Sequence, residues 1–125
     1  MSTEQHIILS TIDKFLEKEV RPVVKEYELA DKYPHDIVIK MKEFGLFGAT
    51  ISEEYGGLGL SAEIYAQIVE HVSKVWMSIS GIFNSHLIMC TAIEKFGNDS
   101  MKEKFLPLMA RGELRGGIAL TEPDC

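Results

Sequence analysis

Apolar side chains recur at steps of three and four residues along most of this chain, which is the spacing of one face of an α-helix. Glycine and proline interrupt the pattern often enough to divide it into about five segments. With 46% apolar residues in 125, the chain can bury a core of its own. The sequence therefore predicts an all-α fold, an antiparallel bundle of about five helices.

The first segment predicts one long amphipathic helix. Ser2 and Gln5 have the spacing of a capping box, so the helix should begin there. Pro22 removes an amide and crowds the preceding turn, which predicts a kink rather than an end, because the apolar positions continue beyond it. These positions are Ile8, Ile12, Phe15, Leu16, Val20, Val23 and Tyr27.

Four further helices are predicted, over residues 34–44, 61–76, 79–96 and 99–111. Ser61 and Asp99 are the expected N-terminal caps of the third and fifth. The fourth is apolar around most of its circumference, as a central buried helix would be.

Between the second and third predicted helices, glycines surround an acidic stretch, which predicts a structured loop. No strand precedes this loop and no Lys-Ser or Lys-Thr follows it, so it is read as a tight turn rather than a phosphate cradle.

Residues 116–123 change to an alternating pattern, with Ile118 and Leu120 on one side and Ala119 and Thr121 on the other. This alternation predicts a strand. A single strand has no partner for its backbone groups, so we expect it to open a β domain that the chain does not contain. The expected division is a helical domain over 1–113 and the first strand of a truncated β domain over 114–125.

Charge and composition exclude several classes of function. A net charge of −6 argues against nucleic-acid binding, which depends on clustered Lys and Arg. No basic leader and no run of ~20 apolar residues is present, so we expect a cytoplasmic protein without membrane insertion. Neither Cys90 and Cys125 nor the four histidines have metal-ligand spacing, and no metal is expected.

Several motifs together resemble the acyl-CoA dehydrogenase flavoprotein family over nearly the whole chain. They are Phe44-Gly45-Leu46-Phe47-Gly48, the loop Ile51-Ser52-Glu53-Glu54-Tyr55-Gly56-Gly57-Leu58-Gly59-Leu60, Ser85-His86, Lys95-Phe96-Gly97, Leu106-Pro107, Gly112-Glu113 and Ala119-Leu120-Thr121-Glu122-Pro123. The family usually continues from this last motif to Gly-Ser-Asp or Gly-Thr-Asp, whereas here the chain ends at Asp124-Cys125.

The resemblance implies an FAD-dependent enzyme of fatty acid metabolism that desaturates acyl-CoA thioesters, passes electrons to an electron-transfer flavoprotein and forms a homotetramer. It implies no catalytic residue in this chain, because the Glu that acts as the catalytic base in the family belongs to a C-terminal helical domain. The expected cofactor-binding residues are Ile118, Leu120 and Thr121. The expected substrate-binding residues are Ser80, Gly81, Asn84, Ser85 and Ile88.

Several of these residues, and two ionisable ones, also have a purely structural explanation. Thr121 could simply end a strand, and Ser80, Gly81 and Ser85 could permit close helix packing. Glu122 is read as part of a turn, and His86 as a core histidine hydrogen-bonded to a neighbour.

At the level of the whole chain, the leading hypothesis is a dehydrogenase fragment that is inactive alone. The alternatives are a stand-alone helical binding or assembly module, and the same domain from a related flavin oxidase or monooxygenase.

Overall fold

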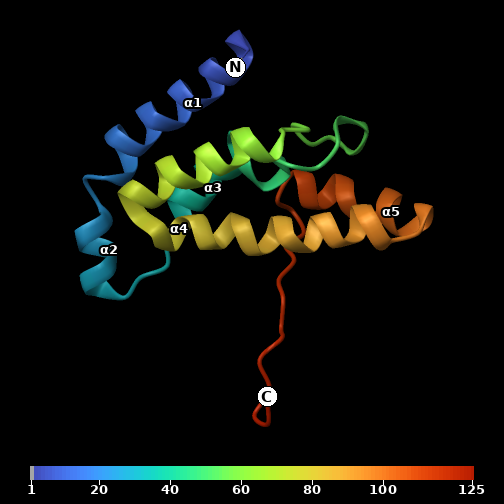
Figure 1. The fold of residues 1–125 in the computed structure, drawn as a ribbon. Coiled ribbons are helices and arrows are strands. Elements are labelled where there is room, and N and C mark those ends of the chain that lie inside the picture. The colour runs from blue at the N-terminus through green and yellow to red at the C-terminus, as the bar shows by residue number, and fades with distance from the viewer. Residues whose placement is uncertain (1) are drawn as a thin grey trace.

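The computed structural model describes residues 2–125, which form helices joined by short turns and contain no strand. Figure 1 shows the helices packed together and a C-terminal segment that leaves them. The predicted all-α fold is confirmed. The elements are α1 (Thr3–Phe15), the π-helical turn η1 (Leu16–Val20), α2 (Val24–Ala30), α3 (His35–Glu43), the 3-10 turns η2 (Leu46–Gly48) and η3 (Glu53–Tyr55), α4 (Ala62–Phe96) and α5 (Asp99–Ala110).

The longest element, α4, is two helices in one. Its backbone leaves the helical region at Trp76, where φ is −157° and ψ is 100°. Figure 1 shows that the chain turns back there, so that the first arm and the second arm of α4 lie side by side. The break falls where the sequence predicts the third helix to end and the fourth to follow. The second arm ends at Phe96, as predicted, and Gly97 caps it.

The predicted long N-terminal helix is broken more completely than a kink would require. The Arg21 N–H bonds the carbonyl of Leu16, five residues back, at 2.8 Å, and a turn at 21–23 separates η1 from α2. Pro22 has no N–H to continue the helical ladder. Beyond this turn α2 buries no residue fully, although Tyr27 is half-buried. The apolar spacing thus continues past Pro22, but on a separate short helix.

The core lies between the two arms of α4, the N-terminal helices and α5. α1, η1, both arms of α4 and α5 contribute side chains with no more than 2% exposure, as do α3 and η2. These side chains include Ile12, Leu16, Val20, Met41, Phe47, Ile68, Val72, Ile79, Phe83, Leu87, Cys90, Leu106 and Met109. By length and composition alone α4 could cross a membrane, with a mean hydropathy of 1.2 in its most apolar window. Its apolar side chains form the centre of this bundle instead, as the sequence predicts for a central helix.

Helix caps match the sequence with one correction. Ser2 and Gln5 form the predicted capping box, and Ser61 accepts the Ile64 N–H. The cap of α5 is Asn98, whose Oδ1 accepts the Met101 N–H at 2.9 Å, and the prediction of Asp99 is wrong by one residue. Asn98 is the last residue with extended backbone, and only that position aims its side chain at the free amides of the first turn.

The glycine loop is a tight turn, as predicted. The amides of Leu58, Gly59 and Leu60 bond carbonyls of residues 48–51 at 2.9 Å, which folds the loop back onto its own start. At Gly57 an added Cβ would lie 2.0 Å from the carbonyl oxygen of Ile51, so only glycine fits. The loop uses its amides internally, which leaves no cradle for a phosphate.

The alternating segment 117–121 is extended and exposed, and within residues 2–125 its backbone has no hydrogen-bond partner. Figure 1 shows it running away from the bundle. A ladder requires a neighbouring strand, which the described chain does not supply. The backbone carbonyl of Glu122 accepts the Cys125 N–H, which closes the turn expected at this point. The division at residue 113 and the strand itself remain predictions.

Candidate substrate groove and chain exit

A groove of about 370 Å³ runs along α4 where its two arms meet the loop before it. Asn84 and Ile88, two of the predicted substrate-binding residues, line it. The lining is mostly apolar, with hydroxyl and amide groups but no carboxylate: Thr50, Leu60, Ala62, Tyr65, Asn84, Leu87, Ile88 and Thr91. A surface of this kind suits a hydrocarbon chain better than a charged ligand.

One hydrogen bond joins the two arms of α4 across this groove. The Tyr65 hydroxyl donates to Asn84 Oδ1 at 2.6 Å. Burial raises the pKa of Tyr65 to about 12, so the phenol keeps its proton at neutral pH and acts as a donor. This bond holds the Asn84 side chain against Tyr65, and both residues line the groove.

The other predicted substrate residues lie outside the groove. Ser80 is buried, and its hydroxyl donates to the Met77 carbonyl at 2.6 Å and accepts from Ser73, which favours a structural role at the bend. Gly81 and Ser85 are exposed on the second arm. A Cβ at Gly81 would meet nothing within 4 Å, so no helix packing in the described chain requires this glycine.

The predicted cofactor residues Ile118, Leu120 and Thr121 are all exposed on the extended segment, with Leu120 at 79% exposure. None of them lines the groove. The structure thus brings Asn84 and Ile88 together at one surface and leaves the predicted cofactor residues apart from it.

His86 lies at the centre of the bundle with 1% exposure, and the interpretation as a core histidine is confirmed. Its Nε2 lies 2.9 Å from the carbonyl oxygens of both Phe47 and Met109, while its Nδ1 accepts the Gly116 N–H at 3.2 Å. These partners assign the single ring proton to Nε2. Burial lowers the pKa of His86, so the ring is neutral at pH 7.

The hydrogen-bond partners of His86 could not be predicted from the sequence, because they lie far from it along the chain. Phe47 precedes it by 39 residues and Gly116 follows it by 30. Next to Gly116, Arg115 donates to the Tyr33 hydroxyl at 2.7 Å, and its guanidinium carbon lies 5.9 Å from the Tyr33 and Phe47 ring centroids. No periodicity or motif in the sequence links these positions.

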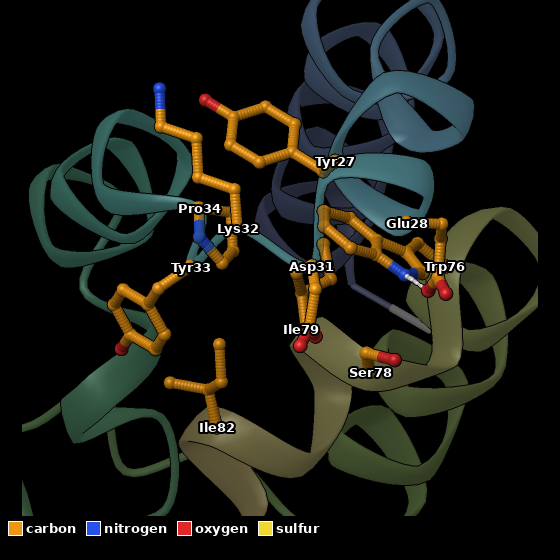
Figure 2. A pocket seen from close by; sticks show the side chains of 10 residues that line it. All are labelled: Tyr27, Glu28, Asp31, Lys32, Tyr33, Pro34, Trp76, Ser78, Ile79 and Ile82. Atoms are coloured by element: carbon orange, nitrogen blue, oxygen red, sulfur yellow. Dashed lines mark hydrogen bonds between the residues drawn. The ribbon is translucent and has the colours of Figure 1, made fainter.

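A second cleft, of about 410 Å³, lies between α2 and the break in α4, and Figure 2 shows the side chains around it. The Trp76 indole N–H donates to Glu28 Oε1 at 2.5 Å, the dashed line in Figure 2. Lys32 lies over the Tyr27 ring, 5.8 Å from its centroid. The chain's own side chains thus already contact the aromatic groups of this cleft. The Trp76 side chain itself is buried.

Within residues 2–125, no three His, Cys, Asp or Glu side chains come together in a metal-binding arrangement. Cys90 lies 3.4 Å from His86 Nε2, and burial raises the pKa of its thiol to about 12. This thiol is therefore protonated at neutral pH and a poor nucleophile.

Comparison with known proteins gives a consistent match. The family model described as "Acyl-CoA dehydrogenase, N-terminal domain" matches residues 2–113. The short-chain-specific acyl-CoA dehydrogenase of Clostridium acetobutylicum is 34% identical, over 99% of this chain and 33% of that protein. The acryloyl-CoA reductase (NADH) of Anaerotignum propionicum is also 34% identical, over 99% of this chain and 32% of that protein.

A solved structure described as the electron transferring flavoprotein of Acidaminococcus fermentans contains a similar chain. It matches with a TM-score of 0.89 and 33% identity, over 98% of this chain and 33% of that one. The chain therefore spans about a third of the length of the proteins it matches.

Proposed function

Because the chain belongs to the acyl-CoA dehydrogenase family, where it corresponds to the N-terminal domain, we propose that it is the helical domain of an FAD-dependent enzyme that desaturates acyl-CoA thioesters. The observation that carries this proposal is that the family model spans the whole helical bundle, residues 2–113. The apolar groove on α4 supports it with a surface of the right chemistry.

The groove is proposed to form one wall of the acyl-chain site. Each methylene that an acyl chain buries there would contribute about 0.8 kcal/mol. Ile88, with 47% exposure, would lose this exposure to the ligand, and the Asn84 amide would present the nearest polar group. Gly81 and Ser85 would extend the wall along the second arm of α4, and Ser80 would support it from the bend.

FAD, when bound, would accept the hydride that leaves the β carbon of the substrate. In this chain the proposed contacts are Ile118, Leu120 and Thr121. The exposed backbone of 117–121 bonds no other described residue, so its N–H and C=O groups and the Thr121 hydroxyl fit the polar rim of a flavin ring. They form one edge only. We therefore propose that the chain alone neither retains FAD nor catalyses the reaction.

The base that removes the α proton is proposed to lie outside this chain. No carboxylate lines the groove, and Glu122 is exposed at the turn that ends the extended segment. An electron-transfer flavoprotein as electron acceptor, a homotetrameric assembly and a cytoplasmic location are part of the same proposal. The choice of acceptor is supported by a structure described as an electron transferring flavoprotein, which contains a chain similar to this one.

A second candidate is reduction of an α,β-unsaturated acyl-CoA. It is favoured by the acryloyl-CoA reductase, whose identity to this chain equals that of the dehydrogenase. The groove suits both desaturation and reduction, since substrate and product share one carbon skeleton.

A flavin oxidase or monooxygenase remains a third candidate. A stand-alone binding module is less well supported, because residues 117–121 have no partner in the bundle.

The test is a chimaera in which these 125 residues replace the matching first third of the Clostridium acetobutylicum enzyme. We expect a flavin-containing protein that reduces an artificial electron acceptor when given a saturated acyl-CoA. The isolated chain is expected to be colourless and inactive. A folded chimaera that binds FAD but turns over no acyl-CoA in either direction contradicts the proposal, and turnover only with unsaturated substrates and a reductant selects the second candidate.

A further inference from the structure

The chain leaves the helical bundle at Gly116, and His86 holds it there. Nδ1 of the buried imidazole accepts the Gly116 N–H at 3.2 Å, while its Nε2–H is shared by the carbonyls of Phe47 and Met109, each at 2.9 Å. One neutral ring therefore connects α4 to η2, to the end of α5 and to the exit of the chain. Since both ring nitrogens are used, its orientation is fixed.

Two neighbouring contacts fix the same point. A Cβ at Gly116 would come within 2.8 Å of Met89 Cγ and 2.9 Å of Met109 Cε, so the backbone packs directly against these side chains. Arg115 donates to the Tyr33 hydroxyl at 2.7 Å. Residues 115 and 116 are thus held by three parts of the chain: α4, α5 and the loop that contains Tyr33.

The contacts stop immediately after this point. A Cβ at Gly117 would meet nothing within 4 Å, and residues 117–121 are exposed. Ile118, the first proposed flavin contact, comes two residues after Gly116. An extended chain spans at most about 3.6 Å per residue, so the position of Gly116 limits Ile118 to within about 7 Å of it. The contacts that fix Gly116 therefore also limit where the proposed flavin edge can begin.

We propose that His86 is a positioning residue, which holds the Gly116 amide and so fixes the point at which the flavin-binding segment 118–121 leaves the bundle. The role of that segment rests on the proposed function. The hold on Gly116 does not, because it is visible in the contacts of this chain alone.

Two substitutions separate the two functions of the ring. In His86→Gln the side-chain amide nitrogen reaches the position of Nε2 and can still donate to Phe47 and Met109, but no acceptor remains for Gly116. In His86→Asn the side-chain oxygen takes the position of Nδ1 and can accept the Gly116 N–H, while the two carbonyls lose their donor. The pair thus distinguishes a local hold from a general loss of stability.

The measurement is backbone amide exchange of the 15N-labelled chain by NMR. We expect Gly116 to be protected in the parent chain and Gly117 to exchange freely. His86→Gln should speed Gly116 exchange at least tenfold while the protection of Phe83 and Leu87 changes less than threefold. His86→Asn should lower the protection of the whole bundle and keep Gly116 protected relative to Gly117. The steady-state 15N–1H NOE should fall from residue 117 onward in the parent, and from residue 115 or earlier in His86→Gln.

Two results would overturn the proposal. One is a parent chain in which Gly116 exchanges as fast as Gly117. The other is a His86→Gln variant whose Gly116 protection follows that of Phe83 and Leu87. Neither measurement involves flavin or substrate, so failure here is separate from failure of the proposed function. In the chimaera, His86→Gln is then expected to raise the dissociation constant for FAD several-fold, and His86→Asn to restore it.

Discussion

Gly57 and Gly81 differ in whether the structure requires a glycine. At Gly57 a side chain would collide with the backbone of Ile51, whereas at Gly81 it would point into open space on a helix. We expect Gly57→Ala to lower the free energy of unfolding by about 3 kcal/mol or more, because the backbone must move. Gly81→Ala should raise it by about 0.5–1 kcal/mol, since alanine restricts the unfolded chain and favours the helix. Urea unfolding measures both; equal effects would contradict this reading of the loop.

His86 should make the stability of the bundle depend on pH. Its pKa in the folded chain is lowered by burial, from a usual value of about 6.5. As the pH falls below about 6.5, the unfolded chain takes up a proton that the folded chain resists, so stability is lost toward acid. Replacement by Gln removes this component. The difference in unfolding free energy between the parent and His86→Gln should therefore shrink from pH 7.5 to pH 5, and a difference that stays constant would show that burial does not penalise the charged ring.

At the scale of elements, the start of α5 gives a test of helix capping. Asn98 accepts the Met101 N–H, whereas Asp99 is already the first helical residue. We expect Asn98→Ala to lower the free energy of unfolding by about 1 kcal/mol. Asp99→Ala should lower it by about 0.3 kcal/mol, because it loses only a favourable charge near the helix start. Thermal unfolding of the two variants compares them, and a larger loss for Asp99→Ala would restore it as the cap.

The helices could be predicted from the sequence because their signals are local. The spacing of apolar residues predicts α1, α3, both arms of α4 and α5. The π-helical turn at Leu16–Val20 was missed, since only the position of Pro22 indicated a break. Asn98 and Asp99 are adjacent and both good caps, so sequence alone could not decide between them.

The candidate site could be predicted only in part. Asn84 and Ile88 were expected at the substrate only because of the resemblance to the acyl-CoA dehydrogenase family, and both line the groove in the structure. The contribution of Tyr65 depends on how the first arm of α4 folds back, which no local pattern specifies. The contacts of His86 with Phe47, Met109 and Gly116 join segments that meet only in the folded bundle.

At the scale of the whole molecule, the break at Trp76 creates the proposed substrate surface. It turns α4 back on itself, so that Tyr65 on one arm meets Asn84 on the other and a groove lies between them and the preceding loop. Figure 1 shows the extended segment leaving the same bundle. The bundle thus provides the proposed wall for an acyl chain and the point from which the proposed flavin edge begins.

The central claim is that the groove on α4 contacts the acyl chain. Its most direct test is the acyl-chain preference of the chimaera that carries Ile88→Trp. Ile88 lines the groove with 47% exposure, and Ile39, with 52% exposure on α3, is a matched control outside it. We expect Ile88→Trp to fill the groove and lower kcat/KM tenfold or more for the longest accepted acyl-CoA, with little change for the shortest, while Ile39→Trp leaves the profile unchanged. Identical profiles for the two variants and the parent chimaera would contradict the claim that this groove contacts the acyl chain.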